Sequence, residues 1–133
     1  MPTLIAKAGT KRRILHVPAI WALLLQSLPI GLAGIERQGP RPHEGVRSSY
    51  TTGFGYGVWY ALLHAAGIPF IVVAPGQWKR HWGLVKATKA ASIVRALERY
   101  PQVGTQPRMT EGQAEALLIA GYVRAQLHEK VEP

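Results

Sequence analysis

The alternation of apolar and polar positions divides the chain into short helices and strands. Residues 1–16 offer few apolar partners for their basic side chains, which predicts a loop or an edge strand. Pro18 is followed by apolar residues at helical spacing, so a short helix is predicted over 18–28. The apolar run 30–36 predicts a buried strand. Residues 38–47 contain two Pro and two Gly and predict an exposed, basic loop.

The same pattern continues with longer helices in the rest of the chain. A helix capped by Ser48 or Ser49 is predicted to run to about Ala66 and to stop at Gly67, before a second buried strand over 68–74. Three further helices are predicted: 75–83, 88–100 behind a Thr88 cap, and 111 to about 127 behind a Thr110 cap, the last with Ala114, Leu117, Leu118, Gly121 and Tyr122 facing inward. Helices alternating with strands are typical of an α/β fold. A chain of 133 residues is long enough for one core, so residues 1–133 are predicted to form one domain.

Three glycines fall within the predicted helix that ends near Ala66. Gly53, Gly55 and Gly57 each lower helix stability by about 1 kcal/mol relative to alanine. This cost suggests close backbone approach, either to another helix or to a DNA backbone, and the sequence favours neither.

The charge of the chain points to a polyanionic partner. The sequence has 16 Lys and Arg against 7 acidic residues, giving a formal charge of +9. Nucleic acid is favoured over an anionic membrane surface because the basic residues cluster. There is no cysteine, which excludes disulfides and thiolate metal sites. Pro29 interrupts the longest apolar stretch and no signal-peptide pattern is present, so a soluble, cytoplasmic protein is expected.

Three carboxylates are candidates for chemistry. Glu36 ends the first predicted strand, while Glu111 and Glu115 are four residues apart at the start of the last helix. Residues at this spacing share a helix face, where two like charges destabilise the helix unless a cation offsets them. Mg²⁺ accepts such oxygen ligands, with Mn²⁺ as an alternative, and can support phosphodiester hydrolysis. The alternative interpretation is that both helix glutamates only complement the helix dipole.

Several short motifs occur in a fixed order along the chain. They are Ile35-Glu36-Arg37, the stretch 45–57 (GVRSSYTTGFGYG), Gly67-Ile68-Pro69, Pro75-Gly76-Gln77-Trp78-Lys79, Lys89-Ala90-Ala91-Ser92 and the stretch 111–120 (EGQAEALLIA). Together they resemble the phage and plant-chloroplast branch of the RuvC-like Holliday-junction resolvases, over roughly residues 1–125. The resemblance implies an RNase H-like fold, a mixed sheet flanked by helices. It also implies a homodimer that cuts four-way DNA junctions with Mg²⁺.

The same resemblance assigns roles to individual residues. It implies that Glu36, Glu111 and Glu115 are three of four catalytic, metal-binding carboxylates, and that Lys89 is the active-site lysine that holds the scissile phosphate. The fourth carboxylate is an Asp on the family's opening strand, and this chain contains no Asp. That strand is expected to precede Met1, so the chain looks N-terminally truncated. Three interpretations stay open: a resolving endonuclease with impaired activity, a non-catalytic DNA-binding remnant, or a poorly folded translation fragment with no function of its own.

Basic and aromatic residues flank the predicted site in sequence. The predicted DNA-binding residues are Arg37, Arg41, Arg47, Ser49, Tyr50, Lys79, Arg80 and Lys86. Tyr50 could stack on unpaired bases or pack against protein, whereas packing is favoured for Phe54. The four tryptophans, Trp21, Trp59, Trp78 and Trp82, are predicted to lie in the core. The expected partner is branched DNA, in the cytoplasm of a bacterial or phage-infected cell.

Overall fold

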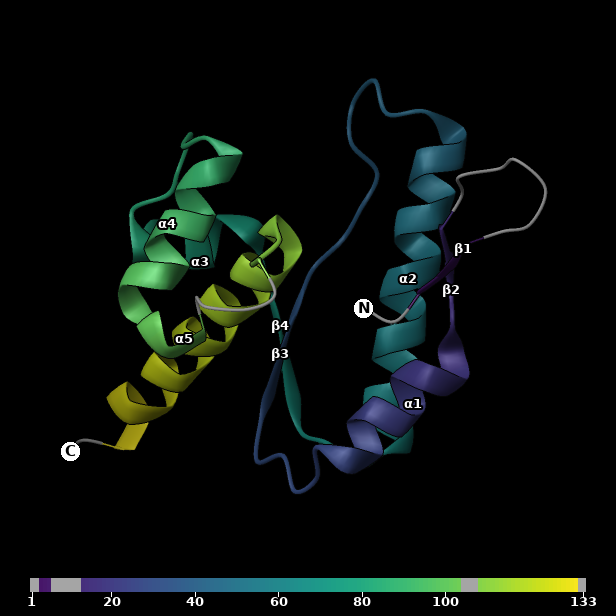
Figure 1. The fold of residues 1–133 in the computed structure, drawn as a ribbon, viewed down its shortest axis with the longest axis horizontal. Helices are drawn as coiled ribbons and strands as arrows, with labels where there is room; N and C mark the ends of the chain where they lie inside the picture. The colour runs from purple at the N-terminus through teal and green to yellow at the C-terminus, as the bar shows by residue number, and fades with distance from the viewer. Residues whose placement is uncertain (1–2, 6–12, 104–107, 132–133) are drawn as a thin grey trace. The chain divides into compact units, whose positions relative to one another are not determined.

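The computed structural model of the chain describes residues 3–5, 13–103 and 108–131. The elements in order are β1 (Thr3–Ile5), β2 (Arg13–Leu15), α1 (Val17–Gln26), β3 (Ala33–Glu36), α2 (Val46–Ala65), β4 (Phe70–Val73), α3 (Pro75–Trp82), α4 (Lys89–Arg99), the 3₁₀ turn η1 (Pro101–Val103) and α5 (Glu111–Val131) (Figure 1). The predicted order of helices and strands is confirmed. Part of the predicted N-terminal loop or edge strand, residues 6–12, lies outside the described residues.

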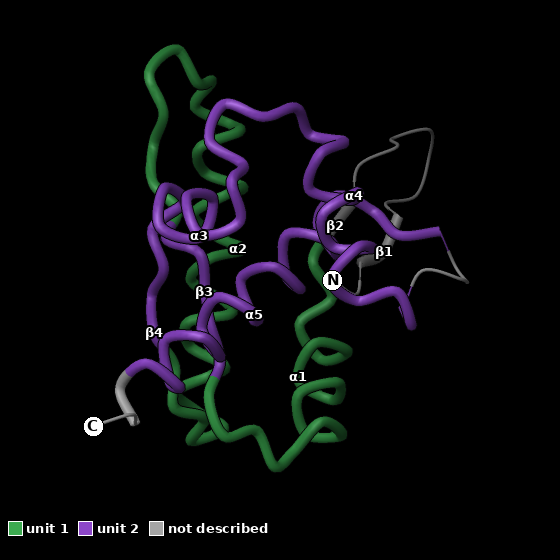
Figure 2. Tube along the Cα trace, turned by 90° about the vertical axis from the view of Figure 1, so that its left-hand side faces the viewer, with its two compact units in different colours: residues 1–32, 38–70 green, residues 33–37, 71–133 purple. Residues whose placement is uncertain are grey.

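These elements form two compact units (Figure 2). Unit 1 contains residues 1–32 and 38–70, with β1, β2, α1 and α2. Unit 2 contains residues 33–37 and 71–133, with β3, most of β4, and all of the remaining helices. That residues 1–133 act as a single domain stays a prediction.

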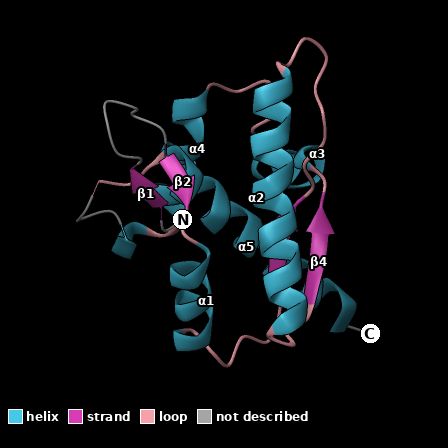
Figure 3. Ribbon diagram, turned by 90° about the vertical axis from the view of Figure 1, so that its right-hand side faces the viewer, coloured by secondary structure: helices cyan, strands magenta, loops and turns pink. Residues whose placement is uncertain are grey.

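Unit 1 begins with a hairpin and a short helix. Strands β1 and β2 pair antiparallel, with Thr3 opposite Leu15 (Figure 3). Helix α1 begins where Nδ1 of His16 accepts a hydrogen bond from the backbone N–H of Ala19 (3.2 Å), with a proline in the first turn as predicted. Its apolar face buries Ile20 and Leu24.

Helix α2 (Val46–Ala65) starts three to four residues earlier than predicted. Its N-cap is Gly45, and the predicted cap by Ser48 or Ser49 is wrong because both residues lie inside the first turns. The end of the helix agrees with the prediction. Gly67 follows the C-cap with φ of +66°, a left-handed conformation that stops the helix.

The glycine-rich part of α2 lies in open space. A Cβ atom built on Gly53, Gly55 or Gly57 would meet nothing within 4 Å among the described residues. Close packing of these glycines on another helix of the chain is therefore not found, and contact with a DNA backbone stays a prediction. Core packing of Phe54 is likewise not found in the described part of the chain, because its side chain is 51% exposed, and its packing in a dimer stays a prediction.

Unit 2 is built on a parallel pair of strands. β3 pairs with β4, and the backbone N–H of Arg37 continues the pairing by donating to the carbonyl of Val73 (2.8 Å). Parallel strands need a long connection, and α2 lies between them in the sequence. The described strands thus form two separate two-stranded sheets rather than one mixed sheet. Both strands are only partly buried, less than the sequence suggested.

The core of unit 2 forms where α3, α4 and α5 gather beside β3 and β4 (Figure 1). Trp78, Ala96, Ala114 and Leu118 are fully buried. Of the five residues predicted to face inward on α5, Ala114 and Leu118 are therefore confirmed, while Leu117, Gly121 and Tyr122 are half-buried. The prediction missed Ile119 and Val123, which are buried.

The tryptophans divide between core and half-buried positions. Trp78 is in the core as predicted, whereas Trp21, Trp59 and Trp82 are half-buried. The indole N–H of Trp82 donates to the carbonyl of Leu118 (2.8 Å), which ties α3 to α5. None of the helices in the described ranges is both long and apolar enough to cross a membrane.

Candidate active site

The two helix glutamates belong to a longer ridge on α5. Glu111, Glu115, Ile119 and Val123 follow one another at four-residue spacing and therefore lie along one side of the helix. Thr110 fixes the start of this ridge, because its Oγ1 accepts the backbone N–H of Gln113 (3.2 Å), while the Gln113 side chain accepts the backbone N–H of Thr110 (2.9 Å). This reciprocal pair is a capping box, and it confirms the predicted Thr110 cap.

Strand β3 packs on the apolar half of that ridge. A Cβ atom on Gly34 would lie 2.6 Å from Cγ2 of Val123 and 3.0 Å from Cγ2 of Ile119, so only glycine fits there without a shift. Side chains two residues apart point to the same face of a strand, so Glu36 shares the face of Gly34 that looks toward α5. The strand carboxylate and the acidic half of the ridge thus lie on the same side of β3.

The charges of these carboxylates interact. The pKa of Glu115 is raised, first by burial and then by the negative charges of Glu36 and Glu111. The positive charges of Lys79 and Lys89 oppose this rise. The structure therefore brings together five charged side chains from β3, α3, α4 and α5, all within unit 2.

Trp78 holds the strand carboxylate from the side of α3. Its indole N–H donates a hydrogen bond to Oε2 of Glu36, and its ring is fully buried. The ammonium of the neighbouring Lys79 lies 5.5 Å from the centre of the Trp78 ring. One helix thus supplies both a fixed donor and a cation to the site.

Lys89 is the first residue of α4, and its side chain is exposed. Thr88 occupies the N-cap position, but its side chain makes no capping hydrogen bond, so the predicted Thr88 cap is wrong in that respect. The charge of Lys89 acts on Glu115, and its exposed ammonium is accessible to a ligand phosphate.

The carboxylate oxygens are of the ligand type that a hard metal ion prefers. Among the described residues, no three His, Cys, Asp or Glu side chains lie close enough to hold one ion together. Mg²⁺ is commonly bound through one or two carboxylates and several waters, and its preferred ligands are oxygens. The pKa of Glu115 is raised first by burial and then by the negative charges of Glu36 and Glu111, and a bound cation would offset those two charges.

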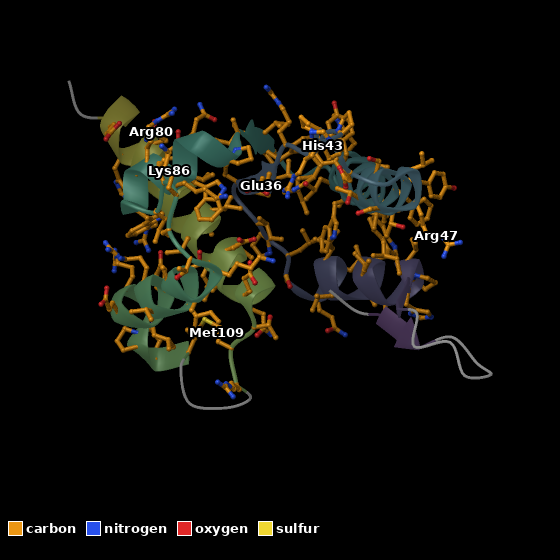
Figure 4. All side chains as sticks on the ribbon, turned by 90° about the horizontal axis from the view of Figure 1, so that it is seen from above. Glu36, His43, Arg47, Arg80, Lys86 and Met109 are labelled. Carbon is orange, nitrogen blue, oxygen red and sulfur yellow. The ribbon has the colours of Figure 1, made fainter. Side chains whose placement is uncertain are left out.

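The predicted DNA-binding residues divide between the two units. Arg37, Lys79, Arg80 and Lys86 belong to unit 2. Arg37 directly follows β3, and Arg80 and Lys86 carry exposed side chains in the last turn of α3 and in the loop after it (Figure 4). Lys79 contributes directly to the electrostatics of Glu115. The structure thus brings at least one predicted DNA-binding cation to the carboxylates.

The other predicted DNA-binding residues, Arg41, Arg47, Ser49 and Tyr50, belong to unit 1. Arg41 and Arg47 are exposed, and the Arg47 side chain extends away from the ribbon (Figure 4). Tyr50 is 72% exposed, so it is open to a partner rather than packed among the described residues. That these residues share a DNA surface with the carboxylates stays a prediction.

Sequence reasoning missed an aromatic cluster in unit 1. The rings of Tyr60, His64 and Phe70 meet edge to face, with centroids 4.8 to 5.2 Å apart. They line a shallow depression of about 470 Å³ together with Gly67, Ile68 and Pro69. The four-residue spacing of Tyr56, Tyr60 and His64 was the signal available in the sequence.

The fold of the chain is that of RuvC. Two solved structures of Thermus thermophilus RuvC show the similarity, each at 23% identity. The structure of RuvC in complex with a Holliday junction substrate matches with a TM-score of 0.56, over 82% of this chain and 67% of the RuvC chain. A structure of RuvC itself matches with a TM-score of 0.54, over 93% of this chain and 87% of the other. No protein-family model and no curated protein sequence matches the chain.

Proposed function

We propose that this protein is a Mg²⁺-dependent endodeoxyribonuclease that resolves four-way DNA junctions by phosphodiester hydrolysis. The observation that carries the proposal is the gathering of Glu36, Glu111 and Glu115, with two lysines, beside β3 in a RuvC-like fold. The charge of +9 attracts a polyanion such as nucleic acid. The clustered carboxylates can bind the divalent cation that phosphodiester hydrolysis uses.

Each residue of the site has a role in this proposal. Glu36, Glu111 and Glu115 would supply carboxylate ligands to Mg²⁺, or to Mn²⁺ in its place, with at most two of them on any one ion and water completing its shell. The bound ion activates water and stabilises the leaving oxygen in phosphodiester hydrolysis. The Trp78 indole keeps the Glu36 carboxylate oriented by its hydrogen bond. Lys89 contacts the scissile phosphate and offsets the negative charge that develops on it.

The partner follows from the charge and from the fold. Arg37, Lys79, Arg80 and Lys86 of unit 2 and Arg41, Arg47, Ser49 and Tyr50 of unit 1 would contact branched DNA. The neighbouring RuvC was solved with a Holliday junction substrate, which supports the same class of ligand here. The sequence motifs favour a homodimeric enzyme of the phage and plant-chloroplast type, acting in DNA recombination and repair in the cytoplasm of a bacterial or phage-infected cell.

The test is cleavage of a synthetic four-way junction. We expect paired nicks near the junction centre with Mg²⁺ or Mn²⁺ and none in EDTA. Glu115→Gln should abolish cutting, whereas Glu129→Gln, which removes an exposed carboxylate elsewhere on α5, should not. Equal cutting by both variants would contradict the assigned site.

A second candidate is a junction-binding protein that does not cut. The observation that favours it is the absence of any aspartate from the sequence, while the resemblance implies an Asp among four carboxylates. This candidate predicts tight, salt-dependent junction binding by a protein that shows no metal-dependent nicking under any of the conditions above.

A further inference from the structure

The loop between β3 and α2 contains a turn that a single carboxylate closes. The backbone N–H of Glu44 donates to the carbonyl of Arg41 (3.1 Å), which makes residues 41–44 a tight turn with Pro42 in second position. The turn is closed a second time by the side chain, because Oε2 of Glu44 accepts the backbone N–H of Arg41 (3.0 Å). The two chain ends of the turn are thus joined by reciprocal hydrogen bonds.

The same carboxylate also joins the turn to helix α2. Its other oxygen, Oε1, accepts a hydrogen bond from Oγ of Ser48 (3.1 Å), in the first turn of the helix. The pKa of Glu44 is lowered, chiefly by the backbone hydrogen bond from Arg41 and further by the hydroxyls of Ser48 and Ser49. Glu44 is therefore ionised at neutral pH, and its carboxylate accepts hydrogen bonds from the Arg41 backbone and from the Ser48 hydroxyl.

The backbone of His43 within this turn adopts a conformation that non-glycine residues disfavour. Its φ is +65°, in the left-handed region that residues other than glycine rarely adopt. Such a conformation persists where neighbouring interactions fix it, and it is found disproportionately where a loop contacts a ligand. The side chains of Arg41 and His43 are both exposed, so the turn presents basic groups to solvent.

A carboxylate repels phosphate, so attraction of DNA does not explain an acidic residue in this basic loop. Residues 37–47 contain Arg37, Arg41, Arg47 and His43, and Glu44 alone among them is acidic. We propose that Glu44 is a positioning residue for DNA binding: its carboxylate fixes the Arg41–Glu44 turn to α2 and thereby holds Arg41 ready for a phosphate. A fixed loop loses less conformational entropy when it binds, which raises affinity.

This inference rests on the proposed function. It predicts a change in junction affinity on replacing Glu44 that is opposite to the change expected from charge alone. Removing a negative charge from a DNA-binding surface should strengthen binding or leave it unchanged. If Glu44 positions Arg41, Glu44→Ala weakens junction binding by about three- to tenfold instead. The matched control is Glu129→Ala, which removes the same charge from an exposed position on α5.

The experiment is equilibrium binding of a four-way junction in EDTA, over a series of salt concentrations. Losing the Arg41 phosphate contact should make the dependence of log K on log salt shallower by about one unit in Glu44→Ala. Glu44→Gln keeps one oxygen acceptor for the Arg41 N–H and should recover part of the affinity. In an Arg41→Ala background, Glu44→Ala should have no further effect.

The outcomes separate this inference from the proposed function. If the unaltered protein shows no salt-dependent junction binding, the proposed function fails. If it binds and Glu44→Ala binds as tightly or more tightly with an unchanged salt slope, the positioning role alone is overturned. If Glu44→Ala does not melt cooperatively, Glu44→Gln is compared with Glu129→Gln instead. Weaker junction binding and a shallower salt slope for Glu44→Gln support the positioning role, and equal or tighter binding overturns it.

Discussion

Gly34 of β3 packs against Val123 of α5 so closely that a single added methyl group would clash with it. Because Glu36 lies two residues further along the same face of the strand, this contact sets how far the strand carboxylate lies from the acidic half of α5. The geometry of the candidate site therefore depends on a position that has no side chain.

Gly34→Ala should lower the free energy of unfolding by about 1–3 kcal/mol, because the methyl group forces β3 and α5 apart. It should also reduce junction cleavage, since Glu36 moves with the strand. Urea unfolding followed by circular dichroism measures the first effect. Gly31→Ala is the matched control, because a Cβ atom there meets nothing within 4 Å. Equal destabilisation by both substitutions would contradict the close approach.

Glu115→Gln should stabilise the protein at neutral pH while it abolishes cleavage. The pKa of Glu115 is raised above its usual 4.5, so its contribution to stability is present below that pH and is lost as pH rises through the raised value. The repulsion within the Glu111–Glu115 pair alone is about 0.2–0.5 kcal/mol. Urea titrations at pH 4 and pH 8 should show a gain for Glu115→Gln only at pH 8. A loss of stability at pH 8 would show that the charge of Glu115 is favourable.

Mg²⁺ should raise the melting temperature of the protein, because an ion bound only by the folded state stabilises it. An ion present at ten times its dissociation constant would add about 1.4 kcal/mol. The effect should be larger at pH 8 than at pH 5, where protonation of Glu115 competes with the ion. Calorimetric scans at constant ionic strength measure it. An equal shift for Glu115→Gln would place the ion elsewhere.

Trp78→Phe should weaken both stability and catalysis. The substitution removes the donor to Oε2 of Glu36 and leaves a space in the core, at a cost of about 1–3 kcal/mol. Cleavage should fall further than stability explains, because the Glu36 carboxylate loses its orientation. Trp21→Phe removes an indole from the half-buried face of α1 and should leave cleavage unchanged. Normal cleavage by Trp78→Phe would show that the hydrogen bond is only structural.

Lys89→Ala and Lys86→Ala should have different effects. Lys89 interacts with Glu115, so its loss should reduce the rate of cleavage about 10²-fold with little change in junction affinity. Lys86, in the loop before α4, should affect affinity and its salt dependence instead. Single-turnover cleavage and binding in EDTA distinguish the two. The assignment fails if Lys89→Ala changes binding alone.

The sequence predicted those features that follow from local chemistry. Thr110 caps α5 as expected, because a hydroxyl and a glutamine three residues later satisfy two backbone N–H groups regardless of the rest of the fold. The start of α2 was misplaced, because the hydroxyl of Ser48 had a stronger local partner in Glu44 than the backbone. Only the resemblance to the resolvases predicted that Glu36 lies near Glu115, because no periodicity relates residues that far apart in the chain.

The packing of Gly34 was also beyond sequence reasoning. A glycine in a strand signals a close approach, but the partner atoms on Ile119 and Val123 belong to a helix more than eighty residues away. The open environment of Gly53, Gly55 and Gly57 shows the converse, because the same residue type carries no packing partner among the described residues there.

The hydrogen bond between Trp78 and Glu36 makes the fluorescence of Trp78 a reporter of the candidate site. A buried indole that donates to a carboxylate has an emission spectrum that depends on the charge beside it, so any cation or phosphate that reaches Glu36 alters the fluorescence of Trp78. Replacing Trp21, Trp59 and Trp82 by phenylalanine leaves this one reporter. Ligand arrival at the carboxylates could then be followed in real time, before any bond in DNA is broken.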